Sequence, residues 1–210
     1  MIAELSTFFG DESLIALTGP RGSGKTEIAL NLVATFDNVQ VYDADMYKPL
    51  MRARDVAMGD RREGNINPQW KYMDTPVIEY TPEVWLNQGL KVVLDMGGGE
   101  LGLVPLTAIK NLLRDRNILF YVVVNPYRPQ AEFLVRRVLS MLPETPKFIL
   151  NPHLLDDTDT DVILHGMELY KEMHLPEPSI LVVLEQVAED VERVVDLPLF
   201  PIRRYLQMEV

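Results

Sequence analysis

The residues best suited to chemistry form one short run, Gly19-Pro20-Arg21-Gly22-Ser23-Gly24-Lys25-Thr26. Its spacing matches G-x-x-x-x-G-K-[ST], a pattern whose glycines let successive backbone N–H groups turn toward a phosphate. The lysine adds a positive charge for the β- and γ-phosphates, and the threonine hydroxyl is a ligand for Mg²⁺. We therefore predict that the whole run binds a nucleotide, and that Lys25 also takes part in catalysis.

The flanking sequence supplies the elements that this motif requires. An apolar run at residues 13–17 comes before it, and a stretch with helical periodicity at residues 27–36 follows. A strand, a loop and a helix in this order place the positive end of the helix dipole at the phosphate. The alternative, a Gly-rich turn that matches by chance, is disfavoured by this context.

Short apolar runs alternate with helical patterns along the rest of the chain. Most runs lack an alternation of polar and apolar residues, which is typical of parallel strands covered on both faces. Phe133, Leu134, Val138 and Leu142 form one of the apolar stripes at helical spacing between them. We predict one domain, residues 1–210, with a three-layer α/β fold and a mostly parallel sheet. The predicted strands are residues 13–18, 39–42, 91–94, 118–124, 147–150 and 179–184.

Two segments do not fit this alternation. Residues 46–89 contain four prolines and both tryptophans, and are predicted to be partly helical. They form either a switch or lid beside the nucleotide, or a structural elaboration at the sheet edge. Residues 197–210 begin with two prolines that disfavour a helix and are predicted to be a C-terminal tail.

Ligands of such sheets bind at the carboxyl ends of the strands, so polar residues at those ends are candidate site residues. Asp95 ends an apolar run and is predicted to hold Mg²⁺ directly or through water. Asp95 and Gly98 also fit a D-x-x-G pattern, in which the glycine N–H meets the γ-phosphate. Asp43 and Asp45 follow the second strand. Mg²⁺ between these carboxylates and the phosphate would relieve their repulsion, with one of them orienting a water; the alternative is a turn or a helix cap.

Asn-Pro pairs follow two later strands, at Asn125 and Asn151. The asparagine amide carries a donor and an acceptor in one plane and can read the edge of a purine. Asn-Pro is equally a common start of a turn, so both interpretations stay open. The histidines, at positions 153, 165 and 174, have no metal-ligand spacing, and we expect them to be exposed or hydrogen-bonded.

The composition limits the class of protein. The chain has 210 residues, 47% of them hydrophobic, a formal net charge of -11 and no cysteine. The negative charge argues against broad nucleic-acid binding, and the lack of cysteine excludes disulfides and thiolate chemistry. We see no signal peptide and no apolar stretch of membrane-spanning length, and so expect a cytoplasmic protein without a membrane segment.

Taken together, these motifs resemble the MinD/ParA/CobQ-type nucleotide-binding proteins, and in particular a bacterial branch of CobQ/MinD-like ATP-binding proteins. The fragments that carry the resemblance are Gly22-Ser23-Gly24-Lys25-Thr26-Glu27, Asp43-Ala44-Asp45-Met46-Tyr47-Lys48-Pro49, Asp95-Met96-Gly97-Gly98, Asn125-Pro126-Tyr127-Arg128-Pro129 and Pro201-Ile202-Arg203-Arg204-Tyr205. The resemblance implies a mostly parallel sheet, Mg²⁺ and ATP, and a nucleotide-dependent homodimer. It also implies that Asp45 orients the attacking water, Asp95 serves Mg²⁺ and Asn151 contacts the base.

One position departs from the family pattern. MinD and ParA proteins carry a lysine early in the loop that reaches across the dimer, and Pro20 stands there in this chain. Arg21 is the adjacent cation and is predicted to take over that catalytic contact.

We therefore expect an ATPase that acts as a switch on an unknown protein partner. ATP is preferred through the resemblance, and GTP is not excluded although no N-K-x-D motif is present. Two alternatives stay open: a small-molecule kinase or ligase similar to dethiobiotin synthetase, and a nucleotide-binding scaffold with negligible turnover.

Overall fold

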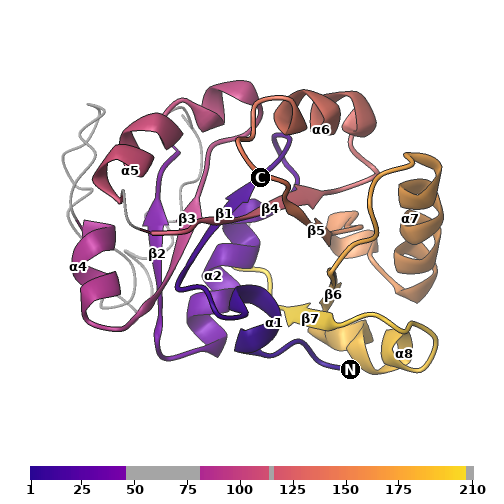
Figure 1. Ribbon diagram of the computed structural model, residues 1–210. Coiled ribbons are helices and arrows are strands. Elements are labelled where there is room, and N and C mark those ends of the chain that lie inside the picture. Colours follow the sequence, from indigo (N-terminus) through magenta and orange to yellow (C-terminus); the bar gives the residue numbers. More distant parts are fainter. Residues whose placement is uncertain (46–80, 114–115, 207–210) are drawn as a thin grey trace.

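The computed structural model describes residues 1–45, 81–113 and 116–206 of the chain (Figure 1). Helices and strands alternate along it, as the sequence predicts. The strands are β1 (Leu14–Thr18), β2 (Val39–Asp43), β3 (Lys91–Asp95), β4 (Leu119–Val124), β5 (Lys147–Leu150), β6 (Ile180–Leu184) and β7 (Leu199–Ile202). The α-helices are α1 (Leu5–Phe9), α2 (Lys25–Thr35), α4 (Thr81–Asn87), α5 (Leu106–Leu112), α6 (Ala131–Leu139), α7 (Thr160–Glu172) and α8 (Ala188–Glu192). Short 3-10 helices are η2 (Glu100–Leu103), η3 (Leu155–Asp157) and η4 (Glu185–Val187).

The seven strands form one parallel sheet in the order β2-β3-β1-β4-β5-β6-β7. After β1 the chain builds β2 and β3 on one side, and then builds β4 to β7 on the other. β1 therefore lies where the direction of winding reverses, between β3 and β4. In open α/β sheets, ligands bind beyond the carboxyl ends of the strands at this point.

Helices cover both faces of the sheet, which gives three layers (Figure 1). On one face, Ile15 and Leu17 of β1 share a core with Phe8 of α1 and Ile28 of α2. The alternate residues of β1 belong to a second core, which holds buried side chains of α4, α5, α6, α7 and α8. Because both faces are covered, β1 and β6 are buried at every residue, which explains why these strands are apolar except for Thr18 at the end of β1.

The strands predicted from the sequence are all present, with ends that differ by at most one residue. The predicted apolar stripe of α6 is wrong at Phe133, whose side chain is 56% exposed. The buried face of α6 consists of Ala131, Val135 and Val138, which follow the helical repeat, whereas Phe133 lies off this face.

The two segments that interrupt the pattern, residues 46–89 and 197–210, are described to different extents by the structure. Residues 46–80 of the predicted switch or lid lie outside the described residues, and its last part forms α4, with Leu86 buried against the sheet. The predicted tail begins with β7, which pairs in parallel with β6. Pro201 is tolerated there because β7 is the last strand of the sheet. The N-terminal residues also bind β7, since Ala3 N–H donates to Leu199 O at 2.7 Å.

No helix among the described residues is long and apolar enough to span a membrane.

Candidate nucleotide-binding site

The glycine-rich loop connects the carboxyl end of β1 to the first residue of α2. Three of its glycines have positive φ: 137° at Gly19, 71° at Gly22 and 95° at Gly24. Only glycine adopts such backbone angles without strain, which explains the spacing of these residues in the sequence. Because α2 begins at Lys25, the N–H groups of its first turn lie at the loop.

Close packing gives a second reason why glycine, and no larger residue, occupies positions 19 and 24. A Cβ atom on Gly19 would overlap the carbonyl oxygen of Val123 in β4, and one on Gly24 would overlap Nδ2 of Asn151. The loop is therefore wedged against the ends of the neighbouring strands, with no space for side chains at these positions.

Lys25 is nearly buried, with 3% of its surface exposed. Its Nζ donates to Pro20 O at 2.9 Å and to Gly19 O at 3.3 Å, so the ammonium group lies inside the curve of the loop. Ser23 N–H also donates to Pro20 O, at 3.4 Å. Two donors thus converge on one oxygen in the interior, which is the arrangement that a phosphate oxygen requires.

The segment after β3 lies directly against the loop. Gly99 N–H donates to Gly19 O at 3.0 Å. A Cβ atom on Gly98 would lie 2.8 Å from the Cα of Arg21, so these two predicted site residues are in contact. Arg21 itself is exposed.

Asp95 is the last residue of β3 and is 1% exposed. Its Cα is paired with Leu17 of β1 on one side and with Asp43 of β2 on the other. Asp95 is therefore one strand away from the loop, and Asp43 is two strands away.

Asp43 and Asp45 make a local turn at the end of β2. The backbone N–H of Asp45 donates to Oδ1 of Asp43 at 3.0 Å, which is the contact that the turn interpretation predicts. The carboxylate of Asp45 is buried and points toward the segment after β3, because a Cβ atom on Gly97 would lie 2.8 Å from Asp45 Oδ1. Asp45 is thus close to the part of the chain that contacts the loop.

The residues predicted to hold Mg²⁺ suit that ion by their chemistry. Thr26 and Asp95 offer buried oxygen ligands at the carboxyl edge of the sheet. Mg²⁺ usually takes one or two protein oxygens together with phosphate and water oxygens, so this donor set fits. Within the described part of the chain, no group of three or more histidine, aspartate or glutamate side chains is arranged to hold a metal ion.

Two side chains from the ends of β4 and β5 reach the loop. Arg128 Nε donates to Gly22 O at 2.9 Å, and Asn151 Nδ2 donates to Ser23 O at 2.7 Å. No role was predicted for Arg128, although it is a cation shortly after the end of β4 and lies in one of the fragments that carry the family resemblance. Asn125, in contrast, holds its own turn, since it accepts from Tyr127 N–H and donates to His153 O.

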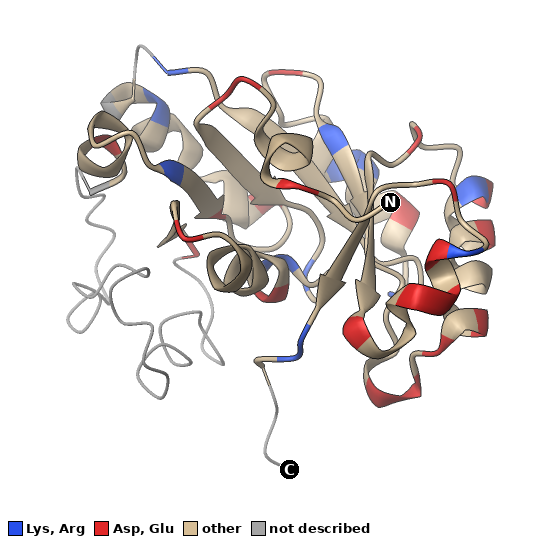
Figure 2. Cartoon of the chain, turned by 90° about the horizontal axis from the view of Figure 1, so that it is seen from below, with Lys and Arg blue, Asp and Glu red and all other residues tan. Residues whose placement is uncertain are grey.

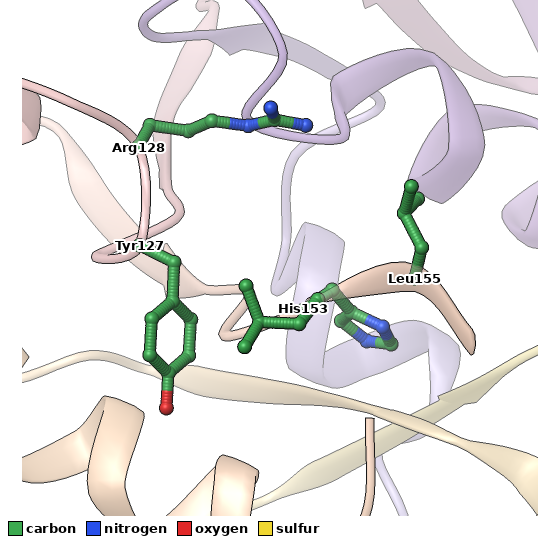
Figure 3. Close-up of a pocket in the computed structure, with 5 residues that line it drawn as sticks. Tyr127, Arg128, His153 and Leu155 are labelled. Carbon is green, nitrogen blue, oxygen red and sulfur yellow. The ribbon is translucent and has the colours of Figure 1, made fainter. Parts of the chain in front are cut away.

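A cavity of about 130 Å³ opens beside Arg128 and is lined by Tyr127, Arg128, His153, Leu154 and Leu155 (Figure 3). Burial and, to a smaller extent, the positive charge of Arg204 lower the pKa of His153 to about 4. His153 Nε2 is buried and has no hydrogen-bond partner among the described residues. The expectation that the histidines are exposed or hydrogen-bonded is therefore wrong at this atom.

The chain after β7 is bound to the surface of α2. Asn31 donates to Arg203 O and accepts from Arg203 N–H, both at 2.8 Å, and Glu27 accepts from the N–H groups of Tyr205 and Leu206. Desolvation raises the pKa of Glu27, against these hydrogen bonds, which lower it. Two arginines, Arg203 and Arg204, follow β7 toward the C-terminus, whereas acidic residues gather on α7 and α8 (Figure 2).

No protein-family model and no curated protein matches the chain. Among solved structures, the signal recognition particle 54 kDa protein from Aeropyrum pernix K1, in complex with GDP, matches at 17% identity with a TM-score of 0.46. That match covers 81% of this chain and 41% of the other, so the chain spans less than half of that protein's length. A Pnkp1/Rnl/Hen1 complex matches at 14% identity with a TM-score of 0.35, over 91% of this chain and 96% of the other. The loop and the sheet themselves have the arrangement of a P-loop fold: a glycine-rich loop between an inner strand of a parallel sheet and the helix that follows it.

Proposed function

We propose that the chain binds a nucleoside triphosphate together with Mg²⁺ in the loop 19–26 and hydrolyses it. The observation that carries this proposal is the backbone of the loop. Its positive-φ glycines, the buried Lys25 and the start of α2 all meet at the carboxyl end of β1. Backbone N–H groups and a helix N-terminus in this arrangement bind phosphate.

Each candidate residue has a defined role in this proposal. Lys25 exchanges its contacts with Gly19 O and Pro20 O for the β- and γ-phosphate oxygens. Thr26 and Asp95 hold Mg²⁺, with Asp43 at greater distance. When bound, Mg²⁺ neutralises the charge that develops on the phosphates. Asp45 orients the attacking water from its position against Gly97.

The identity of the base and the biological role follow from the resemblance to MinD/ParA/CobQ-type proteins. That resemblance favours ATP over GTP and a homodimer formed on nucleotide binding, in which Arg21 contacts the partner's phosphates. Arg21 is an exposed residue of the loop, and this position supports the proposed contact with the partner's phosphates. Hydrolysis would then switch the interaction with a protein partner.

Calorimetric titration of the protein with ATP, GTP and ADP, with and without Mg²⁺, tests binding. Release of inorganic phosphate tests hydrolysis, and the same assay with candidate acceptor molecules separates a switch from a kinase. We expect Mg²⁺-dependent binding, and phosphate release that needs no acceptor. A protein that binds no nucleotide refutes the proposal, and acceptor-dependent phosphorylation replaces hydrolysis by kinase activity.

A further inference from the structure

Side chains from three different elements bind the backbone carbonyl groups of the loop. Lys25 of α2 binds the carbonyls of Gly19 and Pro20 from within the loop. Arg128, which follows β4, binds Gly22 O, and Asn151, which follows β5, binds Ser23 O. The last two contacts bridge 106 and 128 residues of sequence, so they form only when the sheet is assembled.

The direction of a carbonyl determines the direction of the next N–H group. In a planar trans peptide, the C=O of one residue and the N–H of the next point to opposite sides of the chain. When Arg128 holds the carbonyl of Gly22, the N–H of Ser23 must point the other way. It does so in this structure, because Ser23 N–H points into the loop and meets Pro20 O. By the same geometry, Asn151 turns the N–H of Gly24 away from itself.

We infer that Arg128 and Asn151 are positioning residues for phosphate binding. They hold the carbonyls of Gly22 and Ser23 away from the ligand, so that the N–H groups of Ser23 and Gly24 face it. This inference rests on the proposed function and deepens it, since it identifies what keeps the loop in its binding conformation. It also gives Asn151 a role at the phosphate, in addition to the contact with the base that the resemblance implies.

The surroundings of Asn151 support a positioning role. The residue is 4% exposed, and its Nδ2 lies against the Cα of Gly24, where no side chain would fit. Its Oδ1 is buried and has no hydrogen-bond partner among the described residues. The Nδ2 group of the amide therefore binds the loop. A contact with a base through Oδ1 would need the same orientation of the amide.

Inorganic pyrophosphate is the probe that separates the two roles, because it has phosphates and no base. We expect Asn151→Ala to weaken pyrophosphate binding about tenfold, since a buried carbonyl loses its partner. If Asn151 also contacts the base, the ratio of ATP to GTP affinity changes in the same variant. Asn125→Ala is the matched control, because Asn125 is an equally buried asparagine after the neighbouring strand and contacts His153 instead of the loop. It should bind pyrophosphate like the wild type.

Arg128 gives a second test that does not depend on a buried substitution. Arg128→Gln removes the charge but keeps a nitrogen donor at the position of Nε, whereas Arg128→Met removes both. We expect Met to weaken pyrophosphate binding about threefold to tenfold and Gln to retain most of the affinity. Arg136→Met is the control, because Arg136 lies on α6 and donates to Met173 O at the end of α7 instead of to the loop.

Three results would overturn the inference. In the first, Asn151→Ala changes the ATP to GTP ratio and leaves pyrophosphate binding intact, which makes Asn151 a reader of the base alone. In the second, Arg128→Gln and Arg128→Met lose the same amount of pyrophosphate affinity, which shows that Arg128 acts only through its positive charge. In the third, Asn125→Ala loses as much affinity as Asn151→Ala. Wild-type protein that binds neither pyrophosphate nor ATP would instead refute the proposed function, and this inference with it.

Discussion

The buried ring of His153 makes the stability of the protein depend on pH in a predictable direction. Burial, with the charge of Arg204 as a smaller cause, lowers the pKa of His153 from 6.5 to about 4. The unfolded chain therefore binds more protons than the folded one between these values. The contribution of His153 to the free energy of unfolding is complete above pH 6.5. It decreases as the pH falls through that value and becomes constant below pH 4.

The size of the effect follows from the two pKa values. The full shift corresponds to at most about 3 kcal/mol, and roughly 2 kcal/mol of it should be lost between pH 8 and pH 5. Urea unfolding at these two pH values measures the loss. Carboxylates also titrate in this range, so the informative quantity is the difference between wild type and His153→Phe, which keeps an aromatic ring and cannot bind a proton.

We expect His153→Phe to lose about 2 kcal/mol less than the wild type over this interval. His165→Phe is the control, because the side chain of His165 is 61% exposed and its loss should leave the pH dependence as in the wild type. Equal pH dependence of wild type and His153→Phe would show that the imidazole is protonated without cost in the folded state. The description of His153 as a buried neutral ring would then be wrong.

Four further predictions concern the site and the chain end. Lys25→Met should weaken nucleotide binding by about 1.5–3 kcal/mol in calorimetry, because a charge-assisted contact with phosphate is lost. Asp95→Asn should weaken binding with Mg²⁺ more than binding without it, whereas Asp45→Asn should spare binding and lower phosphate release; equal effects on affinity would contradict these separate roles. Arg21→Ala should lower turnover at least about tenfold if a nucleotide-dependent dimer forms, and sedimentation with a non-hydrolysable triphosphate shows whether it does. Asn31→Ala should lower the free energy of unfolding by about 1–3 kcal/mol in urea, because the two hydrogen bonds between Asn31 and the backbone of Arg203 are lost.

Six of the seven described strands could be predicted from the sequence because each is a short apolar run with turn residues on both sides, whereas β7 lies in the predicted tail. Full burial leaves β1 and β6 apolar except for Thr18, and this gives a clear pattern. The loop could be predicted equally well, since its glycines are needed for backbone angles that other residues avoid. These features are local, and local patterns are what a single sequence shows.

The contacts that join distant parts of the chain could not be predicted in this way. Arg128 and Asn151 reach the loop only because β4 and β5 follow β1 in the order of the sheet. Asn31 meets Arg203 only because β7 brings the chain end toward α2. Strand order is not encoded in hydrophobic periodicity, so the sequence contained these residues without indicating what they touch.

The contacts around the loop differ in kind, and this difference bears on how a ligand could change the structure. Arg128 and Asn151 hold the loop through side chains that extend from the ends of β4 and β5. The segment after β3 holds it through backbone alone, with Gly99 N–H on Gly19 O and Gly98 against Arg21. Because glycine has no side chain and its backbone adopts more conformations than that of other residues, we expect this segment to rearrange most readily of the three. A γ-phosphate beside the loop would therefore act first on residues 97–99, and through Gly97 on the neighbouring carboxylate of Asp45.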